Sequence, residues 1–292
     1  MSAIGDLGGG DPLVPSAATS SAPDGPGSPS ESLSSRVRWA AADSWTITLR
    51  ALQHLVNQPF VLVVGLLFPI LMLLMFAYLL RGGYGASYPE VLVPGMLALT
   101  TVFGLEGTMT AIVTDANRGI TDRFRSLPMA GSAVVAGRGI ADMLNATIGL
   151  IVLMGCGLLI GWSWEDGLLN GLAAVALLLW LRFAMIWLGL FLGLVAGKPE
   201  AVMAVQILVW PLGFLSNAFS DPGTMPDWLG TIAEWNPLSA TVAATRELFG
   251  NPGWGGDSWA ATHALELAIL WPLLLTTVFF PLAVAKYRSL SR

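Results

Sequence analysis

The chain has 292 residues, of which 54% are hydrophobic and only 11% charged, and its formal net charge is −5. Soluble domains contain about twice that share of charged residues, so the composition argues against a soluble protein and predicts that long uncharged stretches lie in lipid. The single cysteine, Cys156, excludes an internal disulfide.

Residues 1–35 are rich in Gly, Pro, Ser and Ala and contain four acidic residues but no basic one. Such a stretch buries too little apolar surface to offset its chain entropy, so we expect a disordered N-terminus on the cytoplasmic side. It is not a signal peptide, because it has no basic region followed by an apolar one.

Residues 36–57 predict an amphipathic helix. Apolar residues recur at spacings of three and four, while polar residues that include Arg36 and Arg50 recur every seven positions on another face. A helix of this kind is suited to the membrane interface, with Trp45 at the level of the lipid headgroups. The alternative is a helix packed on the surface of another protein.

Six apolar stretches follow, each near or above the roughly 20 residues that cross the hydrocarbon core. They cover about residues 60–80, 91–114, 140–161, 168–196, 201–220 and 259–285. Prolines inside some of them are tolerated because neighbouring helices satisfy the freed backbone groups. The sequence therefore predicts an all-α polytopic membrane protein whose transmembrane domain, residues 36–292, has six transmembrane helices.

The basic residues are distributed unevenly between the predicted loops. With the N-terminus in the cytoplasm, eleven Lys and Arg residues lie on the cytoplasmic side and two, Arg81 and Arg246, lie outside. This bias sets the orientation of membrane proteins. We therefore expect a multi-pass protein of the plasma membrane with both termini in the cytoplasm.

Three ionisable residues, Glu106, Arg182 and Glu266, lie inside predicted spans. An unpaired charge at the bilayer centre costs about 2.5–3.5 kcal/mol on insertion scales, so we expect them to face the bundle or water. They line a substrate path or a proton relay, or else they are structural, with Arg182 paired to Glu106. Glu266 lies close enough to the outer end of its span to reach the interface.

The predicted outer segment of residues 221–250 is too polar to span the membrane and too apolar for a free loop. Its pattern predicts two short amphipathic helices that dip into the outer leaflet, separated at Asn236-Pro237. An ordinary surface loop is the alternative.

Candidate residues for catalysis are missing from the sequence. The two histidines, His54 and His263, lie on different predicted sides of the membrane, and no group has metal-ligand spacing. There is no Gly-x-x-x-x-Gly-Lys-Ser/Thr loop to hold a nucleotide phosphate. We therefore expect no metal, no cofactor bound by this chain and no nucleotide hydrolysis by it alone. The small arginine cluster near the membrane is not a nucleic-acid-binding surface.

The Arg-rich segment of residues 115–130 lies between the second and third predicted spans. Thr121 is a good N-cap, and Pro128 ends a helix of about one and a half turns. This helix presents two arginines beside an apolar pair, which suits a groove in a partner protein; a plain positively charged turn is the alternative. This predicted short helix and its ends comprise Thr121, Asp122, Arg123, Phe124, Arg125, Leu127 and Pro128.

On two motifs, the chain resembles the permease subunits of ABC-2 type exporters, in the daunorubicin-resistance-like branch. NRGITDRFRSLP at residues 117–128 is similar to the family's cytoplasmic coupling helix, although Asn117 stands where many members have an acid. The second motif resembles the family's outer re-entrant helices and combines MPDWL, NPL and ATREL. Its distinguishing residues are Pro226, Trp228, Asn236, Pro237 and Arg246.

The resemblance implies a pair of six-span permeases, identical or related, that work on two ABC-type ATPase subunits. ATP and Mg would bind to these partners, and the coupling helix would transmit their closure to the spans. Residues 36–57 would act as a gate helix through Arg36, Trp45 and Arg50, and membrane lipids would surround the spans. The implied substrates are amphiphilic drugs, lipids or lipid-linked glycans. A proton-coupled secondary transporter and a membrane scaffold without transport stay open as alternatives.

Overall fold

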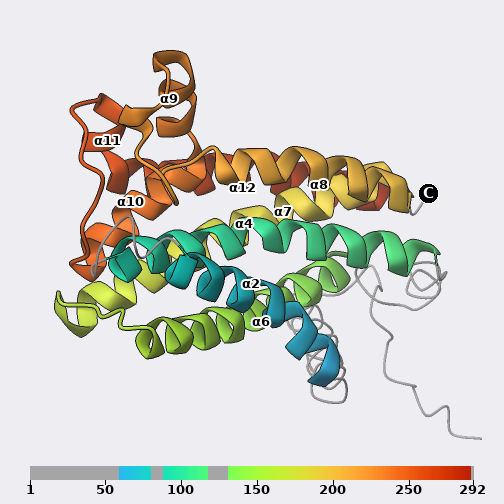
Figure 1. The fold of residues 1–292 in the computed structure, drawn as a ribbon. Coiled ribbons are helices and arrows are strands. Elements are labelled where there is room, and N and C mark those ends of the chain that lie inside the picture. The colour runs from blue at the N-terminus through green and yellow to red at the C-terminus, as the bar shows by residue number, and fades with distance from the viewer. Residues whose placement is uncertain (1–58, 80–87, 118–130, 291–292) are drawn as a thin grey trace, which may run out of the picture.

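The computed structural model of the protein describes residues 59–79, 88–117 and 131–290. Within these ranges every regular element is a helix (Figure 1), which confirms the predicted all-α fold. Three predicted features lie outside the described residues: the disordered N-terminus, the amphipathic helix of residues 36–57 and the coupling helix of residues 121–128.

The described helices follow one another along the chain with short connections. They are α2 (Pro59–Leu79), α4 (Tyr88–Asn117), α6 (Gly131–Leu159), α7 (Gly167–Ala196), α8 (Pro199–Phe214), the 3-10 turn η1 (Pro222–Thr224), α9 (Asp227–Glu234), α10 (Pro237–Phe249), α11 (Trp259–Thr262) and α12 (Ala264–Leu290).

Four of the described helices are long and apolar enough to cross a membrane. These are α4, α7, most of α6 (residues 137–159) and most of α12 (residues 264–287). Helix α8 (residues 199–214) is a shorter apolar helix, and α2 is apolar as well. The chain therefore has the helices of a multi-pass membrane protein.

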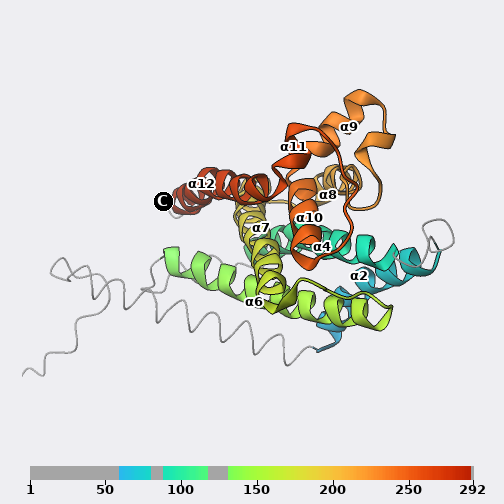
Figure 2. The ribbon, with the colours of Figure 1, turned by 90° about the vertical axis from the view of Figure 1, so that its left-hand side faces the viewer.

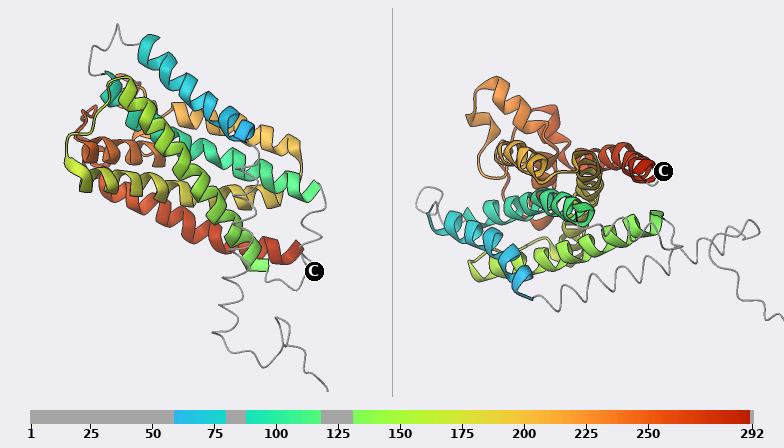
Figure 3. Two further views of the ribbon diagram at one scale, coloured as in Figure 1. Left: turned by 90° about the horizontal axis from the view of Figure 1, so that it is seen from below. Right: turned by 90° about the vertical axis from the view of Figure 1, so that its right-hand side faces the viewer.

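Helix α7 lies at the centre of the bundle, where it packs mainly against α4 and α12. Small residues bring it close to α4: a Cβ atom at Gly189 would lie only 2.9 Å from the carbonyl oxygen of Leu105. In a membrane such contacts replace the hydrophobic effect as the force that associates helices. Helices α2 and α6 contact each other and α4 on another side of the bundle (Figure 3).

The short helices α9, α10 and α11 gather at one end of the bundle (Figures 1 and 2). The last residue of α4 and the first of α6, which flank residues 118–130, lie at the opposite end, as does the C-terminal end of α12. With its 30 residues, α4 is about 45 Å long, which exceeds the roughly 30 Å hydrocarbon core. The two helix ends that flank residues 118–130 and the short helices therefore lie at opposite ends of the bundle.

Two helices differ in their bounds from the approximate spans that the sequence predicts. In the predicted span 201–220 the helix ends at Phe214. The backbone carbonyl groups of Leu215 and Asn217, which follow, accept hydrogen bonds from the side chains of Asn236 and Arg246. The predicted span 259–285 is broken at His263, whose backbone leaves the helical region, so α12 starts only at Ala264.

Candidate functional site

A buried polar network joins three helices in the middle of the bundle. Arg182 of α7 is only 5% exposed. Its Nη2 donates a hydrogen bond to Thr108 Oγ1 of α4 at 3.1 Å and lies 4.0 Å from Asp142 Oδ2 of α6. Thr108 in turn donates to the same carboxylate at 2.7 Å. The network therefore compensates part of the buried charge, as a membrane interior requires, while Arg182 Nη1 is buried without a hydrogen-bond partner among the described residues.

The predicted pair between Arg182 and Glu106 is wrong. Successive residues of an α-helix are turned by about 100°, so Glu106 points away from the face of α4 that carries Thr108. Glu106 accepts a hydrogen bond from Gln206 Nε2 of α8 at 2.8 Å instead. Its other oxygen, Oε1, is buried and has no hydrogen-bond partner among the described residues.

A second ion pair joins α4 to α6 near the ends that flank residues 118–130. Arg138 Nη1 of α6 donates to Asp115 Oδ2 of α4, and both side chains are about one-third exposed or less. Asp142 follows Arg138 by one helical turn, so α6 presents both groups on one face. Neither Asp115 nor Asp142 stands out in the sequence, because each lies near one end of an apolar stretch.

The third predicted intramembrane charge has no part in this network. Glu266 lies in the first turn of α12, and its side chain is exposed. An acidic residue there interacts favourably with the helix dipole. Among the described residues, no three His, Cys, Asp or Glu side chains come together as a metal site would need.

Arg246 holds the α10 end of the bundle together. It is 1% exposed, and its Nε and Nη2 donate to the carbonyl oxygen of Val91 in α4 at 3.0 and 2.8 Å. Nη1 donates to Asn217 O and Nη2 also to Ala218 O, both at 2.9 Å. Burial lowers the pKa of this guanidinium to about 9, an effect that nearby Tyr88 opposes, so the group stays charged at neutral pH.

Asn236 makes the second connection at this end. Its Nδ2 donates to the carbonyl oxygens of Leu212 and Leu215 at 2.7 and 2.8 Å, while its Oδ1 accepts from the backbone N–H of Leu238. One side chain thus closes the end of α8 and starts α10, with Pro237 at the first helical position.

The remaining residues of the second motif lie apart from these contacts. Pro226 precedes α9, and the Trp228 side chain on that helix is 68% exposed. The structure therefore divides the motif: Asn236, Pro237 and Arg246 fix the backbone between α8 and α10, whereas Trp228 projects outward.

Comparison with known proteins assigns the chain to a family. Residues 43–249 match the family model described as ABC-2 type transporter. The chain belongs to the ABC-2 type transporter family. The resemblance seen in its two motifs is thereby confirmed.

The relatives of this ABC-2 permease include proteins named for drug resistance. It is 34% identical over 256 residues to the daunorubicin resistance ABC transporter permease protein DrrB1 of Streptomyces coeruleorubidus, which covers 86% of this chain and 88% of that protein. It is 23% identical over 210 residues to the doxorubicin resistance ABC transporter permease protein DrrB of Mycobacterium tuberculosis (strain ATCC 25618 / H37Rv). The match covers 72% of this chain and 69% of that protein. A putative transport permease, ycf38 of Pyropia yezoensis, is 24% identical over 208 residues. The match covers 68% of this chain and 70% of that protein.

In this ABC-2 permease, we expect Gly104→Ala to disturb the Arg182 network. A Cβ atom at Gly104 would lie 2.2 Å from Arg182 Nη1 and 2.6 Å from Cζ, so the guanidinium would have to leave Thr108. The expected loss of stability is about 1–3 kcal/mol, measured by thermal unfolding in detergent. Gly107→Ala on the same helix is the matched control, because a Cβ there meets no atom within 4 Å. If Gly104→Ala and Gly107→Ala changed the stability equally, the close packing of Gly104 against Arg182 would be contradicted.

Proposed function

We propose that this chain is the membrane-spanning permease subunit of an ATP-driven exporter, with ATP and Mg bound by a separate ABC-type ATPase subunit. The family match is the observation that carries the proposal. The permease itself would be non-catalytic and would move an amphiphilic drug, lipid or lipid-linked substrate outward. Relatives named for daunorubicin and doxorubicin resistance support this substrate class.

The proposed topology has six spans, formed by α2, α4, α6, α7, α8 and α12, with both termini on the cytoplasmic side of the plasma membrane. Helices α9 and α10 would form the outer re-entrant motif. On α9 the large apolar side chains of Trp228 and Ile232 are 68% and 48% exposed, which is costly in water but suits the lipid headgroup region.

Residues 121–128 would dock on the ATPase, and residues 36–57 would act beside them as the gate helix. The described helices offer a route for the motion. The pair Asp115–Arg138 ties the end of α4 to the start of α6, so both helices that flank the coupling segment would move together. From there, Asp142 connects α6 to Arg182 on the central helix α7.

A second permease copy, identical or related, would complete the transporter. Helix α8 presents a row of exposed apolar side chains, among them Met203, Ile207 and Leu208, which are 64–71% exposed. In the bilayer such a face is covered by lipid or by another helix, and van der Waals packing decides between them.

Whether transport depends on ATP or on a proton gradient distinguishes the proposed function from its alternatives. We expect liposomes that contain this chain with its co-purified ATPase to export cargo only when ATP is supplied. A protonophore should leave the rate unchanged at constant ATP, because ATP binding and not a proton gradient supplies the work. Transport that stops with the protonophore would establish a proton-coupled transporter. Absence of transport under every condition would establish a scaffold.

A further inference from the structure

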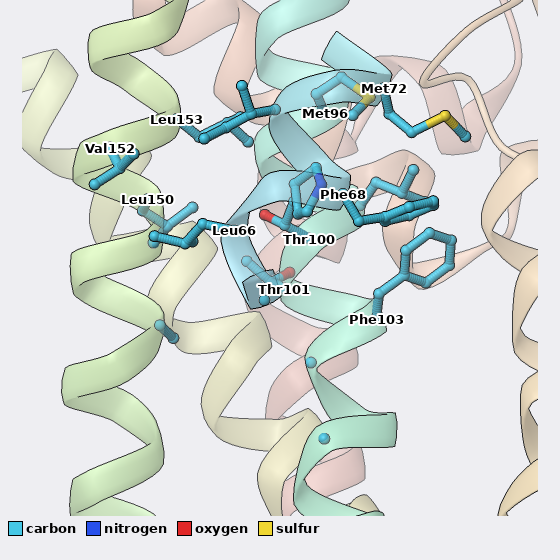
Figure 4. A pocket seen from close by; sticks show the side chains of 18 of the residues that line it. Leu66, Phe68, Met72, Met96, Thr100, Thr101, Phe103, Leu150, Val152 and Leu153 are labelled. Atoms are coloured by element: carbon cyan, nitrogen blue, oxygen red, sulfur yellow. The ribbon is translucent and has the colours of Figure 1, made fainter. Parts of the chain in front are cut away.

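A cavity of about 360 Å³ lies inside the bundle, between α2, α4 and α6. Residues of α7 and α8 also reach its wall. Figure 4 shows the apolar side chains of Met72, Met96 and Leu153 together at one end of this cavity. All of these helices are spans in the proposed topology, so the cavity lies within the membrane.

Polar residues of the lining gather toward the other end of the cavity. Along α4, Glu106 comes after Met96, so it lies nearer the helix end that flanks residues 118–130. Along α6, Asn145 comes before Leu153 and is likewise nearer the end that flanks this segment. Asn145 is exposed, although an uncovered amide is costly in a helix that crosses lipid. The cavity therefore runs from a polar end to an apolar end along the bundle.

Two charged residues of the lining each have a polar atom without a partner. Glu106 Oε1 is a buried acceptor and Arg182 Nη1 is a buried donor, and neither has a hydrogen-bond partner among the described residues. Both residues line the cavity, as does Gly104, where a Cβ atom would lie 2.2 Å from Arg182 Nη1. Their formal charges cancel, so the pair prefers neither a cation nor an anion. It favours an occupant that both donates and accepts hydrogen bonds.

We propose that the polar end of this cavity binds water, which enters from the side of residues 118–130. Water donates to Glu106 Oε1 and accepts from Arg182 Nη1, and the Asn145 amide supplies a third partner, the number typical of a buried water. Each water takes up about 30 Å³ in the liquid, so the cavity has room for several. The direction of entry rests on the proposed topology, in which this side is the cytoplasm.

A lipid tail is the competing occupant of a cavity in a bilayer. It suits the apolar end but would leave Glu106 Oε1 and Arg182 Nη1 unpaired, which is costly in hydrocarbon. Water at Nη1 also supplies the compensation of the buried charge that the contacts of Arg182 with Thr108 and Asp142 leave incomplete. The two unpaired groups therefore decide for water at the polar end.

The test is the access of water-soluble thiol reagents to single cysteines in membrane vesicles. In the full-length chain Cys156 is replaced by serine, and Ala146→Cys places a thiol in the cavity wall beside Asn145. The reagents are two small thiosulfonates, one with a trimethylammonium group and one with a sulfonate, which do not cross lipid. Because the reactive thiolate forms in water, we expect both to label Ala146→Cys in inside-out vesicles at least about tenfold faster than Leu144→Cys.

Leu144→Cys is the matched control, because Leu144 lies two residues earlier on α6 and does not line the cavity. Met96→Cys places the thiol at the apolar end and should be labelled as slowly as Leu144→Cys. Labelling of Ala146→Cys that is no faster than that of Leu144→Cys, from either side of the membrane, would overturn the proposal. That is the behaviour of a cavity filled by lipid tails.

The role of Glu106 is tested in the Ala146→Cys chain. Glu106→Leu removes the acceptor and should slow labelling about tenfold, because an apolar surface does not hold water. Glu106→Gln removes the charge but keeps a hydrogen-bonding group, so labelling should stay within about twofold. Equal slowing by both substitutions, or an unchanged rate in Glu106→Leu, would contradict water binding at Glu106. Size-exclusion chromatography in detergent reports that each variant is folded.

The labelling assay contains neither ATPase nor cargo, so it is independent of the proposed export. If Ala146→Cys is labelled only in right-side-out vesicles, the proposed topology and the cytoplasmic entry fail, and the hydrated site stands. If export depends on ATP but Ala146→Cys is not labelled from either side, only the hydrated site fails.

Discussion

Replacing Arg123 with glutamate is expected to abolish ATP-dependent export while the protein stays in the membrane. Arg123 lies in the predicted coupling helix, where its positive charge would meet an ATPase groove. A like charge placed at such an interface costs several kcal/mol, which is enough to undock the two subunits. The measurement combines export from ATP-loaded vesicles with co-purification of the ATPase, and both should be lost together.

Lys286→Glu provides the matched charge reversal, because Lys286 lies near the C-terminal end of α12 and outside the coupling segment. It should retain both export and the ATPase. Normal export by Arg123→Glu would remove the coupling role from residues 121–128. Labelling of a cysteine placed in this segment by a reagent added outside intact cells would do the same, since docking requires the segment to face the cytoplasm.

Arg246→Leu should destabilise the α10 end of the bundle by about 3 kcal/mol or more. The arginine is the donor for three backbone carbonyl groups, those of Val91, Asn217 and Ala218. A buried acceptor that loses its donor costs about 1–3 kcal/mol, and leucine offers no replacement. Thermal unfolding in detergent should show the loss, and hydrogen exchange should show faster exchange of amides in residues 215–220.

Arg246→Lys separates charge from geometry. Lysine keeps the positive charge but has no planar fork, so it cannot bind all three carbonyl groups at once, and we expect intermediate stability. If the leucine variant unfolds at the same temperature as the native chain, Arg246 does not hold this end together.

The sequence marks some site residues better than others because their signals are local. Asn236 before Pro237 is a helix start that can be read directly, and a helix starts there. The contact of Asn236 with the end of α8 lies 21 to 24 positions back in the chain, and no local pattern reports it. Arg246 stands out only through its family motif, whereas its structural partner Val91 is 155 positions away.

The sequence by itself determined that the chain is helical and crosses the membrane several times, and its two motifs indicated the family. These properties depend on runs of apolar residues and on neighbouring residues, which a linear reading contains. Only the tertiary structure decided that Arg182 pairs with Asp142 and not with Glu106. It also decided at which residue α8 ends and which helices enclose the cavity. Each of these depends on how the helices are rotated about their axes and how closely they pack.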